Sequence, residues 1–273
     1  MKTIVHTELK EKRPLQPVTA RGWRRGLGNL LRKELGEWFG TKKWLVQVLI
    51  WVLILNGITT IIMVTGSDVE ARTTAALTNE VMQTFLPMVL MIVGIGVVIT
   101  IQGAIVGEKQ LGTAAWVMSK PVSRPAFIVA KILAHVIGFG VTAVIIPTAI
   151  FLLETRMLVP LPVDIALFLV GLAVVVLGLL FYLMLAIMLG TVFNSRGPVA
   201  AIGIGLLLAG MLFKGLLPQA ILLATPWLLP DLAVGLALQQ PLPDIWFVPL
   251  VVNAGWIVVF TAVALWRYSR EEF

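Results

Sequence analysis

The chain has 273 residues, of which 59% are hydrophobic and only 13% are charged, whereas an ordinary soluble domain is roughly a quarter charged. Several apolar runs reach the ~20 residues that cross a bilayer as helix, and lipid offers an open backbone no hydrogen-bond partner. This composition excludes a soluble globular protein and predicts an all-α polytopic membrane protein. The chain contains no cysteine, which excludes disulfides, thiol catalysis and cysteine-ligated metals.

The first 43 residues predict two different segments. Residues 1–25 are polar and basic without apolar periodicity, so we expect a flexible cytoplasmic tail. In residues 26–43 apolar side chains recur at helical spacing, which predicts an amphipathic elbow helix lying in the membrane interface. This helix is either a simple anchor or an elbow that helps to hold a cytoplasmic partner. Its apolar face includes Leu31, Leu35, Trp38 and Phe39.

Residues 44–273 predict a membrane domain of six transmembrane helices. Pro125 suits the first turn of the third span, and Asp164 can cap the fourth. The expected spans are residues 44–65, 81–106, 126–153 and 165–192, a fifth that begins near Pro198, and residues 245–266.

Lysine and arginine indicate the orientation of these spans. With the N-terminus inside, 18 of the 21 basic residues face the cytoplasm, and both termini lie there. Membrane topology therefore explains the net charge of +7, and we expect no nucleic-acid partner. The chain is predicted to be a multi-pass protein of the cell membrane.

The region between the fifth and sixth spans is irregular. The apolar run 199–213 has fifteen residues, or roughly 22 Å of helix, which is shorter than a ~30 Å hydrocarbon core. Residues 214–244 are apolar but are interrupted by Pro218, Pro226 and Pro230, and Asp231 can cap another short helix. We expect a re-entrant hairpin in the outer leaflet, packed against protein. It serves either as an outer gate or as a cap that closes the bundle.

Few side chains inside the spans can carry chemistry. Lys131 is expected to snorkel to the cytoplasmic interface, and His135 is expected to form an interhelical hydrogen bond, although its role stays open. The absence of intramembrane carboxylates disfavours an ion-driven carrier. With two histidines, no HExxH motif and no Walker A sequence, we expect no catalytic residue, no metal site and no cofactor on this chain.

The most distinctive segment is the polar loop 107–125 between the second and third spans. Its sequences Glu108-Lys109-Gln110-Leu111-Gly112-Thr113 and Lys120-Pro121-Val122-Ser123-Arg124 match the pattern E-x-x-x-G-T … P-[VI]-S-R. This loop resembles the coupling loop in permease subunits of type-2 ABC exporters, and it departs from that pattern at Ala114-Ala115. The resemblance implies that the loop fits a groove of the nucleotide-binding subunit. The residues implied in contact or positioning are Glu108, Gly112, Thr113, Pro121 and Arg124.

The resemblance also implies partners and a substrate path. ABC ATPase subunits would bind the ATP and Mg²⁺, so this chain is not an enzyme by itself, and it would pair with a second copy or a similar permease in a prokaryotic membrane. The second and fifth spans resemble the central helices of the family, with Met91 and Met211 as possible path residues. An apolar path favours export of a hydrophobic or amphipathic substrate. The alternatives are a non-transporting scaffold or assembly factor and, less favoured, a channel.

Overall fold

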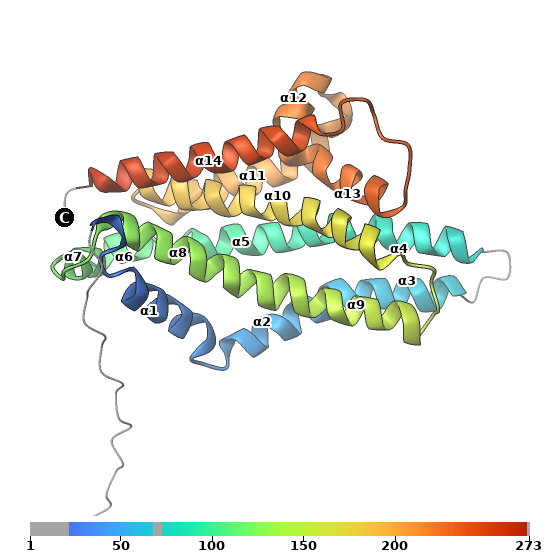
Figure 1. Ribbon diagram of the computed structural model, residues 1–273, viewed down its shortest axis with the longest axis horizontal. Coiled ribbons are helices and arrows are strands. Elements are labelled where there is room, and N and C mark those ends of the chain that lie inside the picture. The colour runs from blue at the N-terminus through green and yellow to red at the C-terminus, as the bar shows by residue number, and fades with distance from the viewer. Residues whose placement is uncertain (1–21, 68–72, 272–273) are drawn as a thin grey trace, which may run out of the picture.

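The computed structural model describes residues 22–67 and 73–271. All regular elements in these ranges are helices, as predicted (Figure 1). Residues 1–21, most of the expected tail, lie outside the described part. Six helical stretches are long and apolar enough to cross a membrane, which confirms the six-span architecture. They are Lys43–Gly66, Thr74–Gln110, Arg124–Met157, Ile165–Val192, Arg196–Leu216 and Val248–Ser269.

The first three spans each contain a π-helical segment between two α-helices. A 3-10 turn (Gly22–Arg24) and α1 (Leu27–Phe39) precede them. The first span comprises α2 (Lys43–Trp51), Val52–Asn56 in π-helix and α3 (Gly57–Ser67). The second comprises α4 (Thr74–Met88), Val89–Val93 in π-helix, α5 (Gly94–Ile101) and α6 (Val106–Gln110), and α7 (Thr113–Met118) follows it. The third comprises α8 (Arg124–Phe139), Gly140–Ile145 in π-helix and α9 (Ile146–Met157).

The fourth span is the continuous helix α10 (Ile165–Val192), and it lies at the centre of the bundle. It contacts α5, α11 (Arg196–Phe213), α13 (Leu229–Ala237) and α14 (Val248–Ser269). Its glycines allow close approach, because a Cβ at Gly171 would lie 2.5 Å from the Ala233 carbonyl oxygen. Small residues let membrane helices approach one another closely in this way.

The predicted helix starts agree with the structure at two spans. Ser123 Oγ accepts a hydrogen bond from the Ala126 N–H at 3.2 Å, with Pro125 in the first turn of α8. Asp164 Oδ1 accepts hydrogen bonds from the Ala166 and Leu167 N–H groups at 2.9 and 3.1 Å. These side chains satisfy N–H groups that have no partner inside the helix.

The fifth span is longer than predicted. It runs from Arg196 to Leu216, which is 21 residues, because α11 begins before Pro198. Proline at the third position of a helix removes only an N–H that has no intrahelical partner there, so Pro198 does not mark the helix start. The expectation that this span is too short to cross the bilayer was wrong.

The segment that follows α11 is helical but interrupted. It contains a 3-10 turn (Lys214–Leu216), α12 (Gln219–Ala224), a second 3-10 turn (Pro226–Leu228) and α13. Asp231 does not cap a helix, because α13 begins at Leu229; instead its carboxylate pairs with Lys214. Trp227 Nε1 donates to the Leu206 carbonyl oxygen at 2.9 Å. Trp256 Nε1 donates to the Ala224 carbonyl oxygen at 2.9 Å, and Asn253 Nδ2 donates to the Thr225 carbonyl oxygen at 3.2 Å. These bonds tie the interrupted segment to the neighbouring spans α11 and α14.

Candidate functional site

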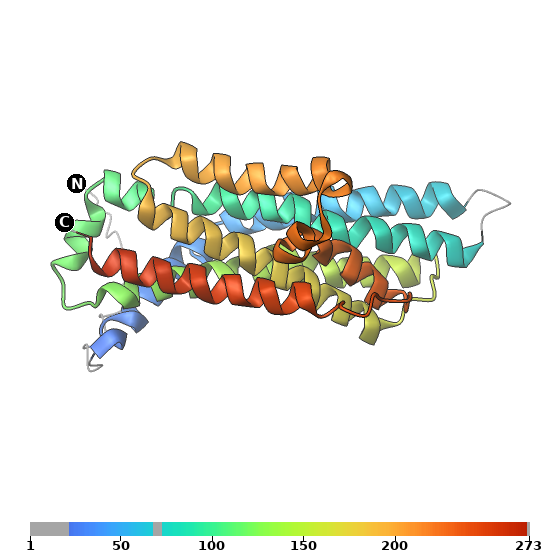
Figure 2. The ribbon, with the colours of Figure 1, turned by 90° about the horizontal axis from the view of Figure 1, so that it is seen from above.

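The polar loop 107–125 folds into two short helices at one end of the bundle. There α6 and α7 lie beside the start of α8 and the end of α14 (Figures 1 and 2). Gly112 separates the two helices with a φ of 67°, a left-handed conformation that favours glycine. The Thr113 hydroxyl donates to the Glu108 carbonyl oxygen at 3.2 Å across this turn. Two of the predicted loop residues therefore define the corner between α6 and α7.

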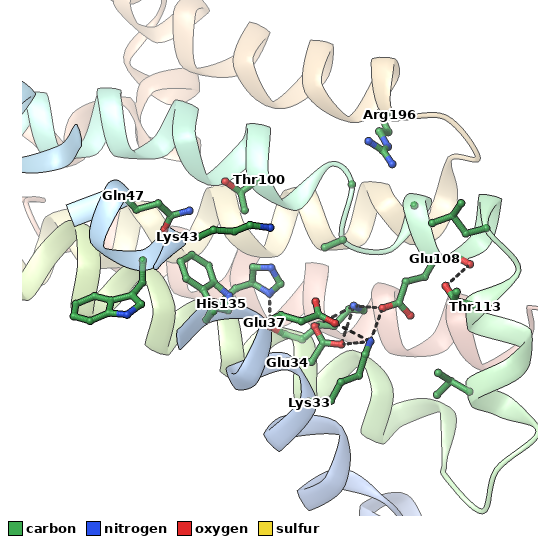
Figure 3. A pocket seen from close by; sticks show the side chains of 18 of the residues that line it. Lys33, Glu34, Glu37, Lys43, Gln47, Thr100, Glu108, Thr113, His135 and Arg196 are labelled. Atoms are coloured by element: carbon green, nitrogen blue, oxygen red, sulfur yellow. Dashed lines mark hydrogen bonds and ion pairs between the residues drawn. The ribbon is translucent and has the colours of Figure 1, made fainter. Parts of the chain in front are cut away.

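A buried cluster of charged side chains joins this loop to α1 and α8. Lys131 Nζ lies 3.1 Å from Glu34 Oε1 and 2.9 Å from Glu108 Oε1. Lys33 Nζ reaches the same Glu108 oxygen at 3.1 Å and Glu34 Oε1 at 3.3 Å (Figure 3). The side chain of Lys131 is only 3% exposed. The snorkelling expected of Lys131 was therefore wrong, because two carboxylates compensate its charge inside the protein.

The charges of the cluster stabilise one another. Burial alone would raise the pKa of Glu34, but the ammonium groups of Lys131 and Lys33 outweigh burial and hold the pKa of that carboxyl below its ordinary value. Burial alone would lower the pKa of Lys33, but Glu34 and Glu108 hold its pKa above the ordinary value. Both shifts favour the ionised forms of Glu34 and Lys33, and each buried charge of the cluster has a hydrogen-bonded partner, as burial requires.

The loop is also bound to the last three spans. Lys109 Nζ donates to the Thr191 carbonyl oxygen at the end of α10 and pairs with Glu271 beyond α14, both at 2.9 Å. Gln110 Nε2 donates to the Asn194 carbonyl oxygen at 2.9 Å. Arg124 Nη1 donates to the Ser269 carbonyl oxygen at 2.6 Å. Glu108 and Arg124 therefore bind other segments of the chain and do not pair with each other.

Helix α1, the expected elbow helix, packs directly on α8. Leu30, Glu34 and Trp38 form its buried side, whereas Leu31, Leu35 and Phe39 are half-buried at the edge of the core. A Cβ at Gly138 would lie 2.4 Å from the Trp38 indole, so only glycine admits this ring. His135 contacts the same ring edge-on, and its Nδ1 lies 2.7 Å from the Lys131 carbonyl oxygen. The hydrogen bond of His135 thus lies within α8, and among the described residues the expected interhelical hydrogen bond does not form. His135 instead contacts α1 through the Trp38 ring.

The last residues of the expected tail are ordered against the loop. The Ser123 N–H donates to the Arg25 carbonyl oxygen at 2.9 Å, and the Ser123 hydroxyl donates to the Trp23 carbonyl oxygen. Residues 22–25 therefore form part of the folded domain. The same serine caps α8, so a single side chain links the start of α1 to the start of the third span.

The outer face of the loop is exposed and apolar. Leu111 is 75% exposed and Trp116 is 66% exposed, whereas Ala114 and Val117 on the opposite side of α7 are buried. Lys120 Nζ lies 4.9 Å from the centre of the Trp116 ring. Large apolar side chains at the tip of a charged loop indicate a surface that binds another protein.

Two cavities adjoin the elements described so far. One, of about 600 Å³, lies between α1, α2 and the loop and is partly lined by the buried ion cluster (Figure 3). The other, of about 200 Å³, brings together the two predicted path residues, Met91 and Met211. Tyr182 and Trp227 also line this second cavity, and Lys214 lies at it. No group of three or more metal-ligating side chains occurs within residues 22–67 and 73–271.

Glu34 is the main site residue absent from the sequence-based prediction. It follows Leu30 by four residues and precedes Trp38 by four, so it lies in the middle of the apolar stripe of an amphipathic helix. An acidic residue in that position needs a buried basic partner, and Lys131 is the one lysine predicted inside a span. An acidic residue in an apolar stripe together with a lysine inside a span was therefore the sequence feature that indicated the Glu34–Lys131 ion pair.

The comparisons with known proteins agree with this architecture. The model of the family described as ABC-2 family transporter protein matches residues 28–273. That range covers all of α1 except its first residue, the loop and all six spans. None of the curated proteins matches the chain.

Proposed function

Because the chain belongs to the ABC-2 transporter family, in which it is a multi-pass permease, we propose that it couples ATP hydrolysis by separate ABC ATPase subunits to export of a hydrophobic or amphipathic substrate. Two permeases, either two copies of this chain or this chain and a similar one, would form the membrane part of the exporter. ATP and Mg²⁺ would bind to the ATPase subunits. The end that carries the loop would face the cytoplasm of a prokaryotic cell.

The connections of the loop are the observation that carries this proposal. Residues 108–110 and 123–124 bind segments of α1, α8, the α10–α11 turn and the end of α14. A push on α7 would therefore reach the elbow and four of the spans through ion pairs and hydrogen bonds. Packed interfaces do not deform continuously but switch between discrete arrangements. A small shift of α7 could therefore move the spans that these contacts bind.

The exposed face of α7 would be the docking surface for the ATPase. Leu111 and Trp116 supply apolar anchors, and aromatic anchors commonly dominate the free energy of protein binding. Gly112, Thr113 and Pro121 would set the shape of this surface, since all three are exposed at the corner or the end of α7. Glu108 and Arg124 would act behind the surface as positioning residues.

The smaller cavity supports an apolar part of the substrate path. It is lined by residues of the second span, α10 and α11, including Met91 and Met211. Methionine adapts to irregular apolar ligands. The ion pair of Lys214 with Asp231 would hold the segment 214–244 against this cavity as a gate that is re-entrant from the outer side.

Co-purification with an ATPase tests the proposal. The chain is co-expressed with an ABC ATPase encoded beside it, extracted in mild detergent and captured by a tag on the permease. We expect stoichiometric ATPase with the wild type and a loss of at least about tenfold in bound ATPase for the double variant Leu111→Ala/Trp116→Ala. Val258→Ala, at an equally exposed apolar position on α14, serves as the matched control.

Two outcomes would contradict the proposal. Retention of the ATPase by the double variant would show that α7 is not the docking surface. Failure of the wild type to bind any neighbouring ATPase would favour the non-transporting scaffold instead.

A further inference from the structure

The 600 Å³ cavity beside the ion cluster contains basic groups that the cluster does not use. Lys33 and Lys131 are compensated by Glu34, Glu37 and Glu108. Lys43 and Arg196 line the same cavity, and no carboxylate among residues 22–67 and 73–271 lies within ion-pair distance of either one. In Figure 3 no interaction line reaches these two side chains.

The wall of the cavity positions the guanidinium of Arg196. A Cβ at Gly107 would lie 3.1 Å from Arg196 Nη2, and one at Gly103 would lie 3.6 Å from Arg196 Cζ. The guanidinium therefore lies against Gly103, in the turn between α5 and α6, and against Gly107 in α6. The planar fork of a guanidinium is pre-organised, so little conformational entropy is lost for each hydrogen bond that it forms with an anion.

The charge of the lining favours an anionic ligand. The cavity is lined by four basic and three acidic side chains, namely Lys33, Lys43, Lys131 and Arg196 with Glu34, Glu37 and Glu108. The lining therefore carries one more positive than negative side chain, and a ligand with a single negative charge would balance it. Guanidinium and ammonium groups together are the usual protein ligands of phosphate oxygens.

The position of the cavity, at the ends of two spans, favours a lipid as the source of an anion. Lys43 is the first residue of the first span, and Arg196 is the first residue of the fifth span. In a membrane, residues at the ends of two spans would lie near the headgroup level of the leaflet on the side of the loop. Trp44 also lines the cavity, and tryptophan is enriched at that level. The volume falls within the ~300–1,000 Å³ range of small-molecule sites.

We propose that this cavity binds the headgroup of an anionic phospholipid, with its phosphate between Lys43 and Arg196. The side-chain oxygen of Gln47 is buried in this lining and accepts no hydrogen bond from the described residues. It supplies an acceptor for a headgroup hydroxyl such as those of phosphatidylglycerol. A bound lipid would contact α1, α2, α11 and the loop at the same time, and so would stabilise their arrangement.

Thermal unfolding of the purified full-length chain measures this binding. The protein is kept in zwitterionic micelles without phosphate buffer and is titrated with short-chain phosphatidylglycerol, phosphatidylcholine or inorganic phosphate. We expect a saturable rise in Tm with phosphatidylglycerol, since a ligand that binds only the folded state stabilises it. Phosphatidylcholine and inorganic phosphate should give no saturable rise over the same concentrations.

Substitutions assign the effect to the cavity. Lys43→Gln and Arg196→Gln should each raise the half-saturating concentration of phosphatidylglycerol at least about tenfold, the factor for ~1.4 kcal/mol of binding free energy. Lys43→Arg and Arg196→Lys, which keep the charge, should stay closer to the wild type and would show that the fold tolerates substitution. Arg32→Gln, on an exposed part of α1 outside the cavity, is the matched control.

The proposal is overturned if Lys43→Gln and Arg196→Gln respond to phosphatidylglycerol as the wild type does, or if phosphatidylcholine acts equally well. An equal effect of inorganic phosphate would assign the site to a free anion and overturn its assignment to lipid. The measurement uses the permease alone, so it is independent of ATPase binding.

Discussion

At the scale of single residues, three charged groups determine how the loop end of this protein is held. Glu34, Lys131 and Glu108 come from three elements that are far apart in the sequence, and their side chains meet with little exposure to solvent. Burying two unlike charges together is not strongly stabilising by itself, but removing one of them leaves the other uncompensated. Such a cluster favours one arrangement of α1, α6 and α8 over all looser ones.

Substitution of Lys131 tests whether its charge compensates the buried carboxylates of the cluster. Lys131→Met should lower the free energy of unfolding by about 3–5 kcal/mol, because it leaves the Glu34 carboxylate buried with only the half-exposed Lys33. The double variant Glu34→Met/Lys131→Met should recover most of that loss. Unfolding in mixed detergent, followed by circular dichroism, measures both values. A double variant as unstable as the single one would contradict the charge argument.

The pKa of Glu34 gives the cluster a defined pH dependence. Because its pKa is depressed in the folded state, ionised Glu34 stabilises the fold above the pKa of an unfolded glutamate, about 4.3. This contribution is lost as the pH falls through the lower, folded pKa. The difference in Tm between the wild type and Glu34→Gln should therefore be full at pH 7 and shrink below about pH 4. A difference that is constant from pH 7 to pH 3 would exclude this linkage.

At the scale of elements, each of the first three spans is interrupted by a π-helical segment. The segments Val52–Asn56 and Gly140–Ile145 belong to neighbouring spans, and Asn56 Nδ2 donates to the Pro147 carbonyl oxygen at 3.0 Å. This bond joins the first span to the third. The apolar pattern revealed the spans but not these segments, because an added residue in one turn hardly changes a run that is apolar on all sides.

The contact between α1 and α8 depends on one glycine. Gly138→Ala should place a methyl group inside the Trp38 ring and destabilise the domain by about 1–3 kcal/mol, as overpacking does. Gly140→Ala is the matched control, since a Cβ there meets no atom within 4 Å. Thermal unfolding of the two variants under the same conditions measures the difference. Equal Tm values would show that α1 does not pack on α8 through this position.

At the scale of the whole molecule, composition and periodicity were sufficient to predict an all-α bundle of six spans. They also located the loop, the cap at Asp164 and the proline at the start of α8. They did not identify the buried cluster. The position of Glu34 in an apolar stripe signals a buried basic partner, but the meeting of Glu34, Lys131 and Glu108 at one point depends on how α1 packs on α8. The length of the fifth span was underestimated for a local reason: Pro198 lies inside the first turn of a helix that starts two residues earlier.

The charge asymmetry predicts one orientation for this bundle. The chain has no cysteine, so single cysteines introduced at Ser119 and Leu158 report the two ends without background. An impermeant thiol reagent added to intact cells should modify Leu158→Cys and leave Ser119→Cys unmodified until the membrane is opened. Labelling of Ser119→Cys in intact cells would reverse the orientation, and equal labelling of both positions would contradict the six-span topology.

Coupling through the loop is the central claim, and the ATPase rate of the assembled complex in lipid nanodiscs tests it most directly. Glu108→Gln removes the charge that binds Lys131 and Lys33 but leaves the exposed face of α7 intact. The account predicts normal ATPase binding with permease-dependent ATP hydrolysis reduced by about tenfold, which corresponds to ~1.4 kcal/mol. Glu37→Gln, an exposed carboxylate bound only to Lys33, should behave as the wild type. Wild-type hydrolysis by the Glu108→Gln complex would contradict the claim.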